Sequence, residues 1–289
     1  MRRGLTLKGR LSLKDWAVYP ALGWTALFFA LPLLAMLTMS FAERVGGKIV
    51  YSGTLANYVG FITRSDGALF SALINSIEVT LMVTVISTLI AYPLAYILAY
   101  RIPPRWQRLL LILIILPFWT SYVIRSYSWL LVLSQNGVIN QALLAAGLID
   151  VPIGFGNTRG ATVLGFVHFF TMLLTLTIYS NLSQIKASYR LAAADLGASP
   201  AQIFLRITLP LSMPGVAVGA FLTFVLAIGD YITPQILGGS KELLLPQAIM
   251  LQIGRTADFP MASALSMILM LVVSAAFLIS ARRLKMERV

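Results

Sequence analysis

The stretch of sequence that decides the fold is residues 189–214, which read YRLAAADLGASPAQIFLRITLPLSMP. Its alanine-rich beginning predicts a short helix over residues 191–196, because alanine loses no side-chain entropy when it enters a helix. Gly197 follows and can take the left-handed backbone conformation that ends a helix. A second helix is expected to follow this break, so that the stretch forms a helical hairpin.

The second helix has a recognisable start. Ser199 is the expected N-cap, Pro200 takes the favoured first position, and Gln202 stands at the third position, where it completes a capping box. The alternative is an ordinary loop helix, which would be less well capped and richer in charge. The small residues of this stretch let another surface approach closely, so a hairpin parallel to a membrane suits the docking of a peripheral protein.

Long stretches without charge lie on both sides of this segment. Of the 289 residues, 58% are hydrophobic and 11% are charged, whereas soluble domains carry about 25% charged residues. A helix needs about 20 apolar residues to cross the hydrocarbon core of a bilayer. The sequence therefore predicts an all-α integral membrane protein with six transmembrane helices, at about 17–41, 71–100, 108–130, 161–185, 209–236 and 261–281.

Two further apolar stretches are not expected to cross the membrane. Residues 126–149 also lack charge, but the break at Ser134-Gln135-Asn136-Gly137 favours a helix end followed by an interfacial segment. Residues 243–253 are interrupted by Pro246 and predict an interfacial helix. With six spans, fifteen of the 22 Lys and Arg residues fall on the side that holds both termini. Because positively charged loops stay in the cytoplasm, both termini are expected to be cytoplasmic.

Composition and motifs exclude several classes of function. The net charge of +12 comes from basic residues that flank apolar segments, which is typical of membrane topology and not of nucleic-acid binding. The absence of cysteine excludes disulfides, thiolate metal sites and cysteine nucleophiles. No phosphate-binding G-x-x-x-x-G-K-[ST] loop occurs. The single histidine, His168, is expected to be a neutral, hydrogen-bonded structural residue, so no catalytic or metal site is predicted.

Residues 189–210 resemble the cytoplasmic coupling loop of the permease subunits of type I ABC importers. That loop carries E-A-A, three residues, G, nine residues and I-x-L-P. The residues that match it at this spacing are Ala192, Ala193, Gly197, Ile207, Leu209 and Pro210, and Asp195 lies within the same loop. Leu191 stands where the family usually has Glu, which removes one polar contact with an ATPase. The resemblance extends over residues 71–283.

This resemblance implies the type I ABC importer permease fold and several partner chains. Two ATP-binding subunits would hold the coupling loop and bind ATP and Mg, so this chain is expected to carry no cofactor and no enzymatic activity of its own. A second homologous permease and a periplasmic solute-binding protein are the other implied partners, in a bacterial inner (cytoplasmic) membrane. The expected divisions are a cytoplasmic tail (1–16), a first helix with a periplasmic loop (17–70), the permease domain (71–283) and a cytoplasmic tail (284–289).

Within this family, the chain is more closely similar to the spermidine/putrescine-type branch. One matching region is the third predicted helix, and the other is the end of the fifth. The residues that carry this similarity are Leu116-Pro117-Phe118-Trp119-Thr120-Ser121-Tyr122, Arg125, Tyr127, Trp129, Asn136-Gly137, Gly229-Asp230-Tyr231-Ile232-Thr233-Pro234 and Gly238-Gly239. The similarity implies transport of a small solute, for which a polyamine is the first expectation.

A polyamine path needs carboxylates, carbonyls or aromatic faces that replace the hydration of the cation. At 1.5 Å per residue, Glu78 is expected about 10 Å below the outer boundary of the membrane, and Asp230 and Tyr231 fall in the outer half or at its interface. Trp119, Tyr122, Ser126 and Trp129 recur at spacings that place them on one face of a helix. The expected path residues are Glu78, Trp119, Tyr122, Trp129, Asp230 and Tyr231.

Each of these residues also has a structural interpretation. Glu78 could pair with Arg125 or stay protonated, and Arg125 itself is expected to extend from a helix end toward the interface. Asp230 could cap a broken helix, and the aromatic residues could form an interfacial belt.

Other functions remain as alternatives. They are the same importer class with an amino acid, an opine, ferric iron or another small solute as substrate, a secondary transporter, and a membrane-embedded enzyme.

Overall fold

The computed structural model describes residues 18–63, 67–239 and 242–286. The expected tail at 1–16 lies outside the described residues, as do the last three residues of the tail at 284–289. In the described part of the chain, five helical segments are long and apolar enough to cross a membrane, and a sixth is added if one bent pair counts as a single span. The first is 18–40 (α2 Val18–Thr25, η1 Ala26–Ala30, α3 Leu31–Ser40), followed by α5 (Ala68–Tyr100). The bent pair is α6 (Pro104–Ile115) with η3 (Leu116–Trp119), and α7 (Tyr122–Val132). The others are α9 (Arg159–Gln184), 200–228 (α11 Pro200–Ile203, η4 Phe204–Thr208, α12 Leu209–Ile228) and α15 (Phe259–Met286).

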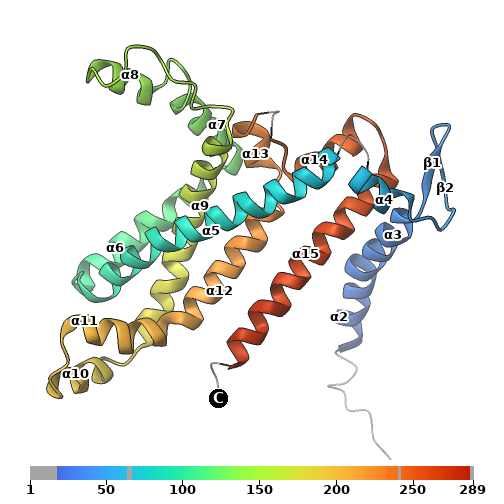
Figure 1. Cartoon of the computed structure of the whole chain (residues 1–289). Helices are drawn as coiled ribbons and strands as arrows, with labels where there is room; N and C mark the ends of the chain where they lie inside the picture. Colours follow the sequence, from blue (N-terminus) through green and yellow to red (C-terminus); the bar gives the residue numbers. More distant parts are fainter. Residues whose placement is uncertain (1–17, 64–66, 240–241, 287–289) are drawn as a thin grey trace, which may run out of the picture.

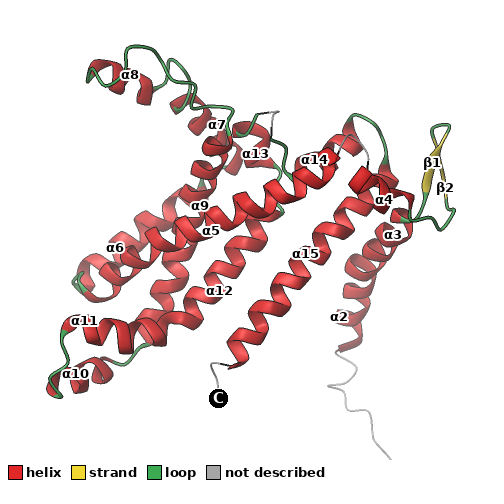
Figure 2. Ribbon diagram, viewed as in Figure 1, coloured by secondary structure: helices red, strands yellow, loops and turns green. Residues whose placement is uncertain are grey.

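The two ends of the molecule differ in the short helices and strands that they contain (Figures 1 and 2). One end holds α10 (Ala187–Asp195) and α11 (Pro200–Ile203), on the same side as the end of α15. The opposite end holds the shorter elements. These are β1 (Glu43–Val45), which pairs antiparallel with β2 (Lys48–Val50), α4 (Ala56–Thr63), α8 (Val138–Ala145), α13 (Ile232–Leu237) and α14 (Leu245–Gly254).

Three spans, α5, α9 and α12 (Leu209–Ile228), form the core of the bundle. Val79 and Val83 of α5 pack against Phe166 and Phe170 of α9, and all four side chains are buried. Small residues bring the helices close together, as membrane helix packing requires. A Cβ placed on Gly215 of α12 would lie 2.4 Å from Cβ of Asn181 on α9. The close α9–α12 approach therefore depends on glycine at this position.

The first span lies at the edge of the bundle. Its first two elements, α2 and η1, contain no buried residue, and α3 packs along α15 (Figure 1). Because a lipid tail is as apolar as a leucine side chain, such an exposed apolar helix is stable in a bilayer without a protein partner. This first span therefore contributes little to the buried core of the bundle.

The third predicted helix, at 108–130, is not continuous, so this prediction is wrong in one respect. α6 (Pro104–Ile115) passes into a short 3₁₀ turn, η3 (Leu116–Trp119), and α7 (Tyr122–Val132) then runs at 92° to it. Thr120 and Ser121 take extended backbone conformations between the two helices. Pro117 explains why the helix weakens here, since it lacks the N–H that would continue the helical hydrogen bonds. We call this break the α6–α7 elbow.

The fifth predicted helix, at 209–236, also ends earlier than expected. α12 stops at Ile228, and α13 begins after a short irregular stretch over residues 229–231. The other boundary predictions agree with the structure more closely. No additional span forms over 126–149, where the described elements are α7 and α8, and the apolar run at 243–253 forms the ten-residue helix α14.

Candidate functional site

The hairpin at one end of the molecule is built from two short helices and a glycine. α10 ends at Asp195, and Gly197 has a φ of +84°. The N–H of Gly197 donates to the carbonyl of Ala194, and the N–H of Ala198 donates to that of Ala193. These bonds satisfy carbonyl groups that the end of the helix leaves without a partner. The predicted helix end at Gly197, with its left-handed backbone, is confirmed.

The second helix starts as its sequence predicts. The Ser199 hydroxyl accepts a hydrogen bond from the N–H of Gln202 at 3.3 Å, and the Gln202 side chain accepts one from the N–H of Ser199 at 2.8 Å. Pro200 is the first residue of α11. α11 then continues through a π-helical turn, η4 (Phe204–Thr208), into α12, so no loop separates the hairpin from a membrane span.

The hairpin and the start of α12 enclose a shallow groove of about 480 Å³. Four residues of the predicted loop motif line it, together with neighbours from both helices. The lining residues are Tyr189, Ala192, Ala193, Leu196, Arg206, Ile207, Pro210 and Leu211. Leu191 is 64% exposed and Leu196 is 89% exposed, while Asp195 and Gly197 are exposed near the tip and Leu209 is half-buried beside the groove. An exposed apolar surface of this kind is suited to contact with another protein.

A second site, which is polar, lies at the opposite end, where α7 meets α13. Asp230 accepts a hydrogen bond from the hydroxyl of Tyr122 and, through Oδ1, one from the N–H of Ile232 at 2.8 Å. The Tyr122 hydroxyl also bonds to that of Thr233. Asp230 therefore caps α13 and joins it to the α6–α7 elbow. The structure thus brings together Tyr122 and Asp230, which the sequence places 108 residues apart.

Arg125 folds back into the elbow instead of extending toward the interface as predicted. Its Nη1 donates to the carbonyl of Pro117 at 3.1 Å, and its guanidinium carbon lies 5.0 Å from the ring centre of Tyr122 and 4.6 Å from that of Phe169. The bend at Pro117 exposes this carbonyl to the side chain. The guanidinium therefore stabilises the elbow through one hydrogen bond and two cation–π contacts.

His168 and Trp129 form the adjoining wall. The indole N–H of Trp129 donates to Nδ1 of His168 at 3.0 Å, which requires that this nitrogen carry no proton. The hydrogen bond agrees with the expected structural role of the histidine. Both residues, with Arg125, line a cavity of about 320 Å³ at the elbow.

Trp119 and Tyr231, two further predicted path residues, lie on either side of this group in η3 and before α13. Trp119 precedes the bend in η3 and is 88% exposed, so it does not share a helix face with Tyr122 and Trp129 as predicted. Tyr231 is half-buried at the start of α13.

Glu78 pairs with Arg159 and not with Arg125. Nη2 of Arg159, the first residue of α9, lies 2.6 Å from Oε2 of Glu78, and its Nη1 lies 3.8 Å from Oε2 of Glu242. The side chains of Glu78 and Glu242 are 55% and 50% exposed. This cluster joins α5, α9 and the segment before α14, and the sequence alone offered no signal for it because Glu78 and Arg159 are 81 residues apart.

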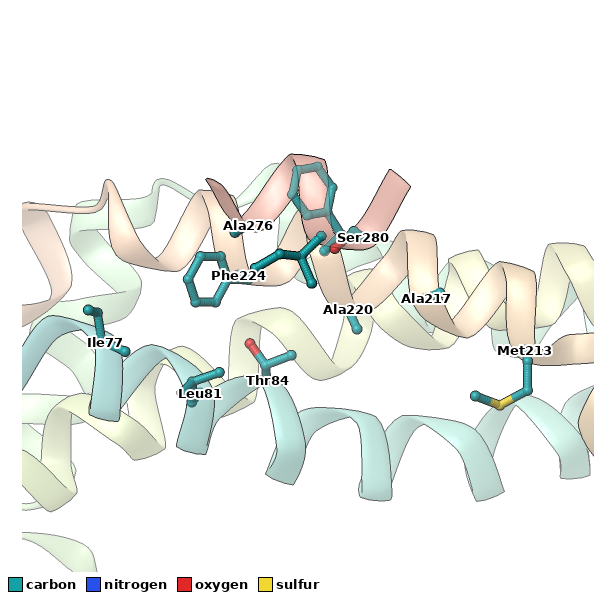
Figure 3. Close-up of a pocket in the computed structure, with 11 residues that line it drawn as sticks. Ile77, Leu81, Thr84, Met213, Ala217, Ala220, Phe224, Ala276 and Ser280 are labelled. Carbon is teal, nitrogen blue, oxygen red and sulfur yellow. The ribbon is translucent and has the colours of Figure 1, made fainter. Parts of the chain in front are cut away.

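A long apolar groove runs between α5, α12 and α15 (Figure 3). It encloses about 540 Å³ and has two hydroxyl-bearing residues, Thr84 and Ser280, in an otherwise apolar lining. Side chains from the three helices project into the same space in Figure 3, among them Leu81, Phe224 and Ala276. The signal that the sequence analysis missed is the small size of three lining residues, Ala217 and Ala220 on α12 and Ala276 on α15, which leaves room between the helices.

Comparison with known proteins identifies the family. Residues 91–285 match the family described as binding-protein-dependent transport system inner membrane component. The spermidine/putrescine transport system permease protein PotB of Salmonella typhimurium is 33% identical over 276 residues, which cover 94% of both chains. The protein of the same name from Escherichia coli (strain K12) is 34% identical over 260 residues, covering 89% of this chain and 92% of that protein.

Solved structures agree with this assignment at the level of the fold. A bacterial alginate ABC transporter, solved in complex with alginate pentasaccharide-bound periplasmic protein, contains a chain of the same fold with a TM-score of 0.76 and 18% identity, covering 92% of this chain and 93% of that one. The MetNI methionine ABC transporter in an inward-facing conformation gives a TM-score of 0.57 and 16% identity, covering 76% of this chain and 95% of that one. The chain therefore belongs to the family of binding-protein-dependent transport system inner membrane components and is a permease subunit of an ABC importer.

Proposed function

We propose that this permease carries a polyamine of the spermidine or putrescine class across the bacterial inner membrane. The observation that carries the proposal is the similarity to permeases named for spermidine and putrescine, at 33% identity over 94% of both chains. The chemistry of the outer end supports it. Carboxylates at Glu78, Glu242 and Asp230, with the ring of Tyr122, offer the groups that can replace water around an ammonium ion.

The mechanism that follows is alternating access in an assembly of several chains. A periplasmic binding protein delivers the solute to the end that holds α13 and α14. A second, homologous permease completes the path, and the groove between α5, α12 and α15 faces it. Two ATP-binding subunits dock on the hairpin at α10 and α11 and hold the ATP and Mg, so that this chain binds no cofactor.

Charge supports the proposed orientation. The elements at the hairpin end carry Arg101, Arg105, Arg108, Lys186, Arg190 and Arg206, and the end of α15 adds Arg282, Arg283 and Lys285. The described basic residues of the opposite elements are fewer: Arg44, Lys48, Arg125, Arg159 and Arg255. Since positive residues favour the cytoplasmic side, the proposed orientation has the hairpin in the cytoplasm, with both termini on the same side.

Uptake by the purified assembly tests this proposal. The transporter and its cognate binding protein are reconstituted in liposomes, and ATP-dependent uptake is measured for putrescine, spermidine, amino acids, an opine, and ferric iron. We expect uptake of a polyamine, with the other solutes transported at background level. Uptake of an amino acid or of ferric iron in place of a polyamine would overturn the assigned substrate class, and ATP-independent transport by the permease alone would overturn the importer mechanism.

A further inference from the structure

Aromatic residues link the hairpin to the inner end of α5. Tyr92, Tyr96 and Tyr100 recur every four residues and so lie on one face of the helix. Phe204, the first residue of η4, packs against this face. Its ring centre lies 6.0 Å from that of Tyr92 and 5.5 Å from that of Tyr96, in edge-to-face arrangements. We call Tyr92, Tyr96, Tyr100 and Phe204 the aromatic joint.

Both ends of the aromatic joint are fixed. At one end, the guanidinium carbon of Arg190 in α10 lies 3.8 Å from the ring centre of Tyr100, and the Tyr100 hydroxyl donates to the carbonyl of Leu182 at 3.0 Å. At the other end, the hydroxyls of Tyr92 and Ser212 lie 2.8 Å apart. The joint therefore connects the first hairpin helix, the end of α9, the start of α12 and the inner part of α5.

The backbone is irregular on both sides of the contact. η4 is a π-helical turn, a conformation that holds one extra residue and often occurs at functional sites. Conversion of this turn to α-helix would rotate Phe204 relative to α12 by about 100°, the angle per residue of an α-helix. On the other side, Pro93 of α5 has no N–H to donate to the carbonyl of Leu89, so the turn over residues 89–93 lacks one backbone hydrogen bond. Phe204 contacts Tyr92, within this weakened turn, and Tyr96, one turn beyond it.

From this geometry we infer that the aromatic joint transmits movement of the hairpin to α5, and that Phe204 is its central positioning residue. This inference rests on the proposed function of the hairpin as the docking site of an ATPase. Movement of the hairpin reaches α12 through a continuous helix, and it reaches α5 through the rings. α5 contributes Ile77, Leu81 and Thr84 to the wall of the groove. A movement of the hairpin would therefore displace both α12 and α5, which form two walls of the groove.

The test compares ATP hydrolysis with uptake in the reconstituted transporter. Phe204→Leu keeps the apolar bulk but removes both ring contacts, and Tyr96→Leu removes the ring contact from the opposite side. Phe70→Leu is the matched control, since Phe70 forms a ring pair with Phe61 at the other end of α5. We expect Phe204→Leu to lower the amount of putrescine transported per ATP hydrolysed about tenfold, the fold-change that corresponds to the interaction energy of two aromatic pairs. ATP hydrolysis stimulated by the loaded binding protein should persist. Phe70→Leu should keep the wild-type ratio of putrescine transported to ATP hydrolysed.

A double variant separates transmission from general packing. If the rings act as one joint, Tyr96→Leu with Phe204→Leu lowers the transport ratio no further than Phe204→Leu alone, because coupled residues are not additive. Hydrolysis and uptake that fall in equal proportion in both single variants would overturn the inference. So would a failure of both variants to assemble with the ATP-binding subunits while Phe70→Leu assembles, which would assign the rings a purely structural role. Absence of uptake in the wild-type transporter would instead refute the proposed function.

Discussion

The two ends of this permease are built in different ways. The hairpin itself is made from one continuous stretch, and the ends of its two helices depend on caps between residues three or four apart, such as Ser199 and Gln202. The opposite end is made from segments far apart in sequence, joined by side chains such as Tyr122 to Asp230 and Arg159 to Glu78. A surface that contacts another protein can be encoded locally, whereas a site for a solute needs groups that converge from several helices.

The strongest test of this difference is Gly197→Asp. A Cβ at Gly197 meets nothing within 4 Å, so the substitution costs the chain only the left-handed backbone strain, about 1 kcal/mol. We expect it to abolish ligand-stimulated ATP hydrolysis, because the new carboxylate blocks close approach of the ATPase. The hydrolysis rate of the assembled transporter, with a melting curve of the permease, measures both effects.

Gly147→Asp is the matched control for this variant. Gly147 has a φ of +66° and an equally open environment, but it follows α8 at the opposite end. Hydrolysis should keep its wild-type rate. Normal stimulated hydrolysis in the Gly197→Asp transporter would contradict the docking role of the hairpin.

A smaller effect is expected from Asp230→Asn at the opposite end. The amide can still accept from Ile232, but the charged acceptor of the Tyr122 hydroxyl is lost, and hydrogen bonds to charged groups exceed neutral ones by roughly 1 kcal/mol. We expect putrescine uptake to slow by about tenfold, while hydrolysis in the absence of ligand stays unchanged.

Asp150→Asn provides the control for this substitution, since Asp150 is an exposed acid beyond α8. Glu78→Gln should also slow uptake, but less than Asp230→Asn does, because the side chain of Glu78 is 55% exposed and already paired with Arg159. Unchanged transport in a protein that carries both Asp230→Asn and Glu78→Gln would refute the cation path.

The last prediction concerns stability and not transport, in the helices that connect the two ends. Gly215→Ala would bring a Cβ within 2.4 Å of Cβ of Asn181, the part of that side chain closest to the backbone, so α9 and α12 must separate. Overpacking of this kind costs about 1–3 kcal/mol, and thermal unfolding in detergent should show a lower Tm. Gly23→Ala, at a helical position with nothing within 4 Å, should leave the Tm unchanged or raise it, and a similar Tm for both variants would disprove the close-packing argument.

The sequence predicted what depends on neighbouring residues. The helix end at Gly197, the cap at Ser199 and the positions of the membrane spans all follow from local patterns and apolar length. The break at Pro117 was missed because the elbow remains as apolar as a span, although the proline was a visible signal. For the fifth helix, the expected bounds of 209–236 ran past the end of α12 at Ile228, but the alternative that Asp230 caps a broken helix is confirmed.

Long-range partners could not be predicted in this way. Glu78 meets Arg159, and Arg125 turns back toward Pro117, only because α5, α7 and α9 adopt a particular arrangement in space. The groove between α5, α12 and α15 likewise depends on how far apart three helices pack. Apolar length and helix periodicity carry no information about such distances.

Arg159 shares its single positive charge unequally between two acids, with Glu78 at 2.6 Å and Glu242 at 3.8 Å. One acid is held closely and the other loosely, so this cluster has one more negative than positive charge without presenting two bare carboxylates. On the proposed cation path, a polyamine would replace Arg159 as the partner of an acid here. Weak, exchangeable contacts of this kind would favour release of the solute inward, as conduction requires of each site along a path.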